Sequence, residues 1–241
     1  MDNFTPDFLN TLCVNVARQL NQLPHELQQA EGSARPETQL IFPATAAKEV
    51  RVSEQEARFL FTQQLEQYEI CYAIETPTLQ RYRFEGTQGG RSASTDVTLF
   101  ERSPDRGFTR KIQFELKAHN VHPKNIEKDF EKLLSEQECG VFFHILKSAN
   151  SGTLTSDKST KGVLVKYRTA FTELLDRLNP EKDTSWFLHF VVFCMKPSFI
   201  ISKTVTAKNF RTIKRFFDFQ YRVSGGEMSV IDNNGWNVLN F

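Results

Sequence analysis

The alternation of apolar and polar residues between positions 96 and 117 constrains the fold more than any other feature. Apolar residues occupy every second position in both halves of this stretch: Val97 and Leu99 in the first, and Ile112, Phe114 and Leu116 in the second. A period of two is typical of a half-buried β-strand. Between the halves, residues 103–107 have the composition of a tight turn, Ser-Pro-Asp-Arg-Gly. The pattern therefore predicts two antiparallel strands joined by a hairpin loop.

The register of this hairpin determines which polar residues meet. A register that buries the apolar residues against one another pairs Val97 with Phe114 and Leu99 with Ile112. The same register places Asp96 opposite Glu115 on the polar face, with Lys117 two residues along on the same side. The sequence therefore predicts two carboxylates and an ammonium close together.

Two carboxylates and an ammonium close together suggest a site for a metal ion. Two carboxylates directly across a ladder repel each other, and a divalent cation between them relieves the repulsion. Mg²⁺ and Mn²⁺ prefer carboxylate oxygens, usually one or two together with water and a substrate phosphate. A nearby lysine could hold or deprotonate an attacking water, or stabilise the developing charge on a phosphate. The pattern indicates metal-assisted hydrolysis of a phosphodiester.

Asp96 followed by Glu115-Leu116-Lys117 at the end of the next strand resembles the PD-(D/E)xK, or restriction-endonuclease-like, nuclease superfamily. The resemblance implies that Asp96 and Glu115 bind Mg²⁺ (or Mn²⁺), helped by the backbone carbonyl of Leu116, and that Lys117 assists the water. It covers roughly residues 53–146, where a helix, a strand, the hairpin, a helix and a strand are expected in that order. Thr95 stands where the family pattern has proline. The implied fold is α/β, with a central mixed β-sheet flanked by helices.

A third acid often comes from the helix before the sheet in this family, and Glu56 is the candidate. It belongs to Ser53-Glu-Gln-Glu56, a capping box that opens a helix extending to about Tyr68. The capping role explains Glu56 as well as the catalytic one does. His119 and His122 act either as proton carriers or as loop and capping residues.

Other interpretations of the hairpin stay open. It could be an ordinary one whose Glu-Leu-Lys is accidental, in an unrelated α/β interaction protein. It could also belong to a non-catalytic member of the same fold that binds nucleic acid or a partner protein. The nuclease hypothesis favours DNA over RNA as substrate, and it leaves a homodimer or a partner subunit open.

The net charge of +1 does not suggest a nucleic-acid-binding protein, but the charge distribution does. Residues 196–222 contain seven basic residues against Asp218 alone, interleaved with aromatic residues, a composition suited to phosphate contacts and base stacking. A solvated helix face with core aromatic residues is the alternative. The residues expected to contact nucleic acid are Lys208, Arg211, Lys214 and Arg215, with a second group of Arg81, Arg83 and Arg91.

A chain of 241 residues can form one large domain. We expect a single α/β domain over 1–241, with an N-terminal helix and irregular segment in 1–50, the core in 53–146, and a helix and sheet extension in 147–241. Further strands are expected at 69–75, 79–85, 140–146 and 186–195, a helix at about 163–178, and a C-terminal hairpin at 229–239 around Asn234-Gly235. Residues 148–162 are expected to form a loop long enough to grip a substrate. Without a signal peptide or a transmembrane-length apolar run, we expect a cytoplasmic protein with reduced cysteines and no membrane partner.

Overall fold

Helices and strands alternate around one large sheet. The computed structural model describes residues 4–27, 39–82, 91–105, 107–119, 121–136, 139–158, 161–177, 186–206, 208–209 and 215–241. The elements are α1 (Pro6–Gln22), α2 (Glu54–Gln67), β1 (Cys71–Tyr82), β2 (Arg91–Ser103), β3 (Gly107–Ala118), α3 (Pro123–Ser135), β4 (Cys139–Leu146), α4 (Val163–Arg177), β5 (Phe187–Cys194), β6 (Phe199–Thr206), β7 (Gln220–Ser224), β8 (Glu227–Asp232) and β9 (Asn237–Asn240).

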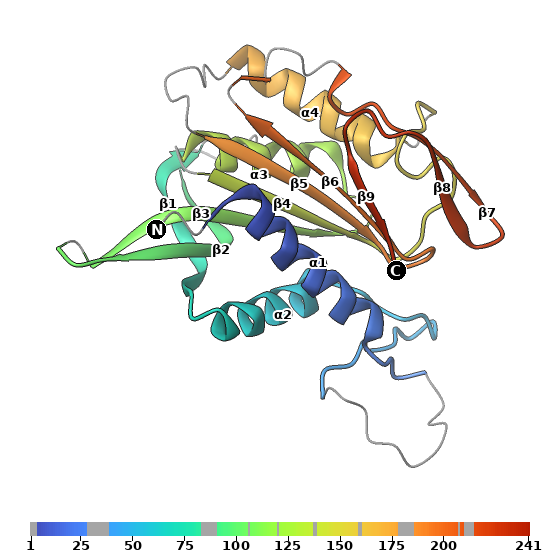
Figure 1. Ribbon diagram of the computed structural model, residues 1–241, viewed down its shortest axis with the longest axis horizontal. Helices are drawn as coiled ribbons and strands as arrows, with labels where there is room; N and C mark the ends of the chain where they lie inside the picture. Colours follow the sequence, from blue (N-terminus) through green and yellow to red (C-terminus); the bar gives the residue numbers. More distant parts are fainter. Residues whose placement is uncertain are drawn as a thin grey trace.

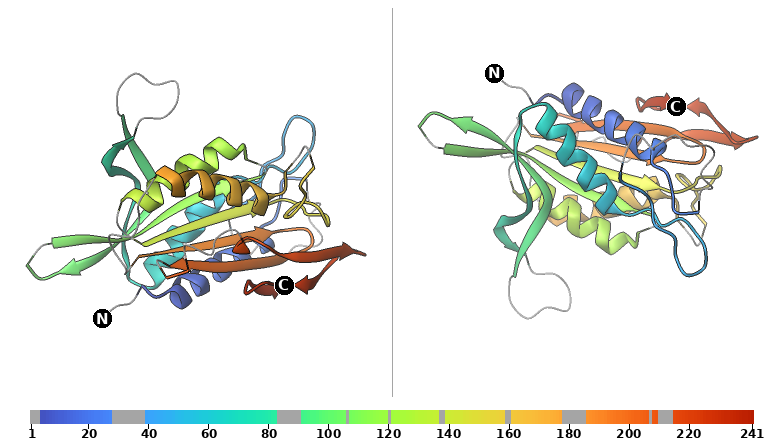
Figure 2. Two further views of the ribbon diagram at one scale, coloured as in Figure 1. Left: turned by 90° about the horizontal axis from the view of Figure 1, so that it is seen from above. Right: turned by 90° about the horizontal axis from the view of Figure 1, so that it is seen from below.

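Seven strands form a mixed sheet in the order β1-β2-β3-β4-β5-β6-β9, and β7 and β8 form a separate two-stranded sheet. β3, β4 and β5 run parallel to one another, and the other neighbours are antiparallel. Helices α1 and α2 lie on one face of the sheet, and α3 and α4 lie on the other (Figure 1). The two views in Figure 2 show each helical layer in front of the strands that it covers. The expected α/β class with a mixed sheet between helices is confirmed.

Each face of the sheet has its own hydrophobic core, because alternate residues of a strand point to opposite faces. Strand β4 illustrates this: Phe143 packs with α1 and α2, whereas Phe142 packs with α3 and α4. The central strands are buried on both faces, so their sequences are continuous apolar runs. The apolar alternation of β2 and β3 faces α1 and α2, which leaves their polar residues facing α3.

Local signals explain where the helices begin. The Thr5 side chain caps α1, and Pro6 follows at its first position. Ser53 and Glu56 form a complete capping box at the start of α2. His122 caps α3 through a ring nitrogen that accepts the Lys124 backbone N–H, again followed by proline. These caps fix where α2 and α3 begin, and the two helices pack on opposite faces of the sheet.

The hairpin register is the one that the apolar pattern predicts: Val97 lies opposite Phe114, and Leu99 opposite Ile112. The two strands expected at 69–75 and 79–85 are in fact one strand, β1, whose register shifts between Pro77 and Arg81. Proline cannot donate to a ladder, and the irregularity therefore sits beside it on the edge strand.

The C-terminal hairpin prediction is wrong. The turn at Asn234-Gly235 exists, with positive φ at both residues. However, the strands on either side of it belong to different sheets: β8 pairs with β7, and β9 pairs with β6. Strands β6 and β7 were not predicted, because the basic residues of 196–222 obscured their alternation.

Candidate active site

Asp96 is attached to the backbone of the Glu115-Leu116-Lys117 segment. Its Oδ2 accepts the Leu116 N–H at 2.6 Å. Asp96 lies in the middle of β2, and the other three residues lie near the end of β3, so the antiparallel pairing of the two strands brings them together. The arrangement places the predicted acid beside the predicted Glu-x-Lys triplet.

An arginine from α2 holds the other oxygen of Asp96. The Arg58 guanidinium lies 2.5 Å from Asp96 Oδ1 and 2.6 Å from Glu75 Oε1. Arg58 and Asp96 are both largely buried, whereas half of the Glu75 side chain is exposed. Arg58 therefore links helix α2 to strands β1 and β2 at this point.

Glu115 lies deeper, beneath α3, and a lysine of that helix neutralises it. Lys132 Nζ lies 2.5 Å from Glu115 Oε1 and 3.1 Å from Asp129 Oδ1, and it donates to the Ser94 carbonyl at 3.0 Å. The Glu115 side chain is only 2% exposed. A carboxylate buried this deeply needs a charged partner, and the Lys132 ammonium provides it while also contacting Asp129 and the Ser94 carbonyl.

Lys117 points into the same region. Its Nζ lies 3.0 Å from Asp129 Oδ2, donates to the Leu116 carbonyl at 3.1 Å, and lies 4.0 Å from Glu54 Oε1. Glu54, in the first turn of α2, also accepts the Ala118 N–H at 3.2 Å. We call these eight residues the charged cluster: Glu54, Arg58, Glu75, Asp96, Glu115, Lys117, Asp129 and Lys132.

Five acids and three cations give the charged cluster an excess of negative charge. Burial raises the pKa of Glu115 well above its ordinary value, and Asp129 and Asp96 raise it further against the opposing effect of Lys132. Burial opposes the charge of Lys117, but Asp129, Glu54 and Glu115 more than offset it and raise the Lys117 pKa. The surrounding carboxylates thus favour the ammonium form of Lys117.

The fit of this cluster to a divalent cation is mixed. The predicted ligands Asp96, Glu115 and the Leu116 carbonyl lie in one region, and the mutual repulsion of carboxylates there favours a cation. Against this, Arg58 and Lys132 already pair with the two acids. Within the described part of the chain, no group of three or more His, Cys, Asp or Glu residues is arranged to hold a metal. A bound ion would thus rest on two carboxylates, a carbonyl and water, the type of set that Mg²⁺ often uses.

Helix α2 supplies an acid next to Lys117, but that acid is Glu54 and not Glu56. The Glu56 carboxylate accepts the Ser53 N–H at 2.9 Å and the Ser53 hydroxyl at 2.5 Å. Glu56 therefore makes the capping-box contacts, and its alternative role as a third catalytic acid stays a prediction. His119 and His122 also have structural partners: the His119 ring contacts the Val52 carbonyl at 2.5 Å, and His122 caps α3.

Besides Glu75 on strand β1, the structure adds four residues to the predicted Asp96, Glu115 and Lys117: Glu54, Arg58, Asp129 and Lys132. Each comes from a helix. Glu54 and Arg58 are four residues apart on α2, and Asp129 and Lys132 are three apart on α3, so each pair lies on one helix face. This spacing is common on solvated helices, and only the tertiary structure distinguishes these pairs from others.

The expected nucleic-acid contacts do not form one surface. Arg81 is exposed on the edge strand β1, while Lys208 and Arg215 are exposed beyond β6. With five strand spacings between β1 and β6, these groups are roughly 24 Å apart across the sheet. The aromatic residues near Arg215, namely Phe216, Phe217, Phe219 and Tyr221, are buried in the core, as in the alternative interpretation. Arg83, Arg211 and Lys214 lie outside the described residues, as does the Arg91 side chain.

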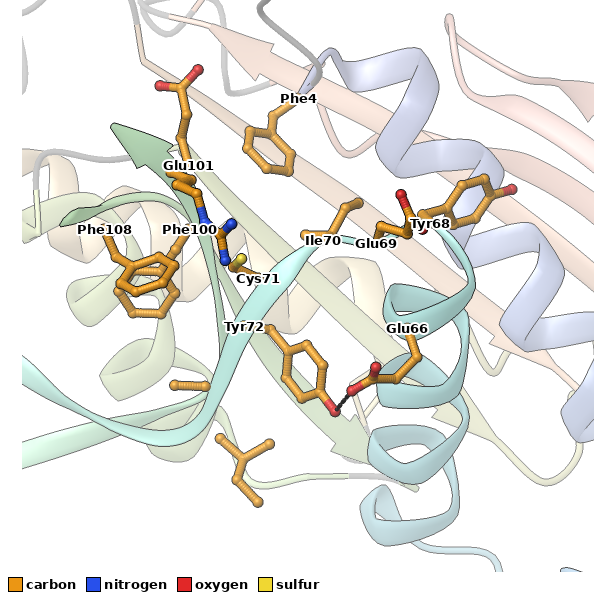
Figure 3. A pocket seen from close by; sticks show the side chains of 13 residues that line it. Phe4, Glu66, Tyr68, Glu69, Ile70, Cys71, Tyr72, Phe100, Glu101 and Phe108 are labelled. Carbon is orange, nitrogen blue, oxygen red and sulfur yellow. Dashed lines mark hydrogen bonds between the residues drawn. The ribbon is translucent and has the colours of Figure 1, made fainter. Parts of the chain in front are cut away.

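A wide hollow lies elsewhere on the molecule. About 1400 Å³ in volume, it opens between the start of α1, the end of α2 and strands β1 and β2 (Figure 3). Tyr72 donates to Glu66 on its wall at 2.9 Å, and Glu69 and Glu101 also line it. Glu66 is twelve residues beyond Glu54 on α2, about 18 Å along the helix axis. A hollow with three acids does not suit a polyanion, and we do not assign it to the charged cluster.

Comparisons of the chain with protein families, with curated proteins and with solved structures found no match. Among the described residues, no helix is both long and apolar enough to cross a membrane. All four cysteines are free thiols.

Proposed function

We propose that this protein is a metal-dependent endonuclease that hydrolyses phosphodiester bonds of nucleic acid, DNA in preference to RNA, in the manner of the PD-(D/E)xK superfamily that its sequence resembles. The observation that carries the proposal is the attachment of Asp96 to the Leu116 N–H, which joins the acid of β2 to the Glu-x-Lys of β3. The succession α2, β1, β2, β3, α3, β4 supports it, because it reproduces the order of elements that the resemblance implies.

Asp96, Glu115 and the Leu116 carbonyl would hold Mg²⁺ or Mn²⁺. A bound ion of this kind polarises a phosphate and lowers the pKa of a coordinated water. The ammonium of Lys117 would orient the attacking water and stabilise charge on the phosphate, since its raised pKa favours the protonated form. Asp129 and Glu54 position this ammonium from two sides.

The test is cleavage of plasmid, single-stranded DNA and RNA with and without Mg²⁺ or Mn²⁺. Asp96→Asn keeps an oxygen that can accept the Leu116 N–H but removes the charge, and Lys117→Met removes the ammonium. Each should lower the rate by about 100-fold or more, as losses of transition-state stabilisation typically do. Lys111→Gln is the matched control, because Lys111 pairs with Glu101 on the far half of β3. Metal-dependent cleavage that survives Asp96→Asn would refute the assignment.

One observation favours a second function, a non-catalytic member of the same fold that binds nucleic acid or a partner protein. Arg58 and Lys132 neutralise the two predicted metal ligands without any ion. Calorimetric titration with Mn²⁺ separates the two functions. Heat of binding that disappears in Asp96→Asn supports the nuclease, whereas no binding of metal together with intact DNA binding supports the second function.

A further inference from the structure

A second hollow, about 460 Å³ in volume, lies between the end of β4, the loop that follows it and the start of α4. Its lining is strongly basic and polar. Lys147, Lys158 and Lys161 contribute ammonium groups, and no Asp or Glu is present among the described residues that line it. Hydroxyl groups of Ser148, Thr153 and Ser156 complete the polar wall. Three cations without matching acids repel one another and attract an anion.

The wall of this hollow is preformed. Gly162 has the loop backbone directly against it, since a Cβ there would lie 2.5 Å from the Leu154 carbonyl carbon and oxygen. The Gly162 N–H donates to the Ser156 carbonyl at 2.8 Å, and the Val163 N–H donates to the Thr153 carbonyl at 3.0 Å. The loop thus satisfies the first amides of α4. An anion in the hollow would be held by the lysines and hydroxyls rather than by the helix terminus.

The three lysines are poorly neutralised. Lys147 Nζ lies 3.9 Å from Glu49, whose side chain is 71% exposed, so solvent screens this pair. Lys158 and Lys161 are exposed and form no ion pair with any described residue. Their charge is therefore available to a ligand.

The hollow lies at the edge of the sheet where β3, the strand that carries Lys117, comes to its end. His119 lines it and follows Lys117 by two residues, about 7 Å along an extended chain. β3 and β4 are parallel, with Lys117 paired with His144, so both strands end at the same edge of the sheet. The His119 N–H donates to the Ile145 carbonyl at 2.7 Å, which fixes the two strand ends together.

We propose that the hollow binds a backbone phosphate of the nucleic acid next to the bond that the charged cluster cleaves. Among the described residues that line the hollow, His119 is the only one with a ring for base stacking, so the sugar–phosphate backbone is the part that fits. This inference rests on the proposed nuclease function and specifies how its substrate is held.

The test is fluorescence anisotropy with a fluorescein-labelled single-stranded 15-mer DNA, in EDTA, across a range of salt concentrations. The double variant Lys158→Gln with Lys161→Gln should bind several-fold more weakly at low salt. Its slope of log K against log salt should fall by roughly 0.7 for each ammonium that contacts a phosphate. The control is Lys111→Gln with Arg102→Gln on the β2–β3 hairpin, which removes the same charge far from the hollow. Thermal melting confirms that both variants fold.

The outcomes separate this inference from the proposed function. Binding by the double variant that equals the control, or no DNA binding by the unmodified protein, overturns the phosphate site. If the double variant binds DNA as well as the control does, but Asp96→Asn abolishes cleavage, the proposed nuclease function is kept and only the phosphate site is rejected. Weakened binding in the double variant, with no metal-dependent cleavage by the unmodified protein, keeps the phosphate site and rejects the nuclease.

Discussion

Glu115 is the least exposed acid among the described residues, and its pKa is raised well above its ordinary value. Burial raises its pKa first, and Asp129 and Asp96 add to the shift. A carboxyl group in this state keeps its proton to higher pH than an exposed glutamate does. A metal ion needs the carboxylate, so the ion must displace the proton.

We therefore expect Mn²⁺ affinity to rise with pH through the range in which Glu115 loses its proton, which lies above that of an exposed glutamate. Below the raised pKa of Glu115 the proton competes with the ion, and above it the carboxylate is free to coordinate. Calorimetry in two buffers of different ionisation enthalpy should detect protons released on binding. The variant Glu115→Gln should lose the pH dependence together with the affinity. An affinity that stays constant over this range would mean that Glu115 is not a ligand.

The roles of Glu54 and Glu56, the two acids in the first turn of α2, can be distinguished by replacing each with glutamine. Glu54→Gln removes a carboxylate that faces Lys117 and should slow cleavage, whereas Glu56→Gln preserves the capping box, which accepts glutamine at this position. We expect Glu56→Gln to leave both the cleavage rate and the free energy of unfolding nearly unchanged. The rate measured in single-turnover assays distinguishes them. Loss of cleavage in folded Glu56→Gln alone would support Glu56 as the third acid.

Only part of the charged cluster could be predicted from the sequence. Asp96, Glu115 and Lys117 follow from strand alternation and register, which are local properties. Arg58 is 38 residues from Asp96 in the sequence, and Lys132 is 17 residues from Glu115. Their contacts depend on which face of each helix packs over the strand ends, and amphipathic periodicity does not specify a partner.

At the scale of elements, α3 is the part that holds the site together from outside the sheet. One face carries Asp129 and Lys132 to the charged cluster. Another face of α3 carries Phe130, which packs into the core. The centroid of its ring lies 4.8 Å from that of Phe142 and 5.3 Å from that of Phe190. These edge-to-face contacts fix the rotation of the helix about its own axis.

Phe130→Ala should destabilise the protein by about 3–5 kcal/mol, the usual cost of removing a buried aromatic side chain. The measurement is urea denaturation followed by circular dichroism. Asn125→Ala, an exposed position on the same helix, should change the free energy of unfolding by less than about 0.5 kcal/mol. A similar loss for both variants would show that the ring contacts of α3 are not what anchors it.

The elements that could be predicted are those with an unbroken period or a clear cap. The helices at Thr5 and Ser53, the β2–β3 hairpin and the apolar run of β4 belong to this group. The prediction failed near the C-terminus, because a turn sequence specifies a chain reversal but not which strands pair after it. The strands flanking Asn234-Gly235 accordingly pair with β6 and β7, which precede them in the sequence.

At the scale of the whole molecule, the two cores share one sheet. Phe142 and Phe143 are neighbours in β4 and belong to different cores. Both tryptophans, Trp186 and Trp236, pack with the core under α3 and α4. Loss of either core removes one of the two layers that cover the central strands, so we expect the cores to unfold together.

Leu12→Ala tests this coupling. Leu12 is fully buried in the core under α1 and α2, and its truncation should cost about 2–5 kcal/mol. Tryptophan fluorescence reports on the other core, yet its urea midpoint should shift as far as the midpoint seen by circular dichroism. Lys111→Gln again provides a surface control. A fluorescence transition that stays in place while the circular dichroism transition moves would mean that the two layers unfold independently.

Strand β1 ends the sheet, and Glu136 at the end of α3 covers part of its outer side. The carboxylate accepts the N–H groups of Leu79 at 2.7 Å and Gln80 at 3.1 Å. Without it, two amide donors beside Leu79, which is 68% exposed, would be open to a strand from a neighbouring molecule. Self-association of Glu136→Ala, followed by light scattering during storage, should exceed that of Glu49→Ala, an exposed acid far from β1. By accepting these two N–H groups, the Glu136 side chain keeps the β1 edge of the sheet from pairing with a strand of a neighbouring molecule.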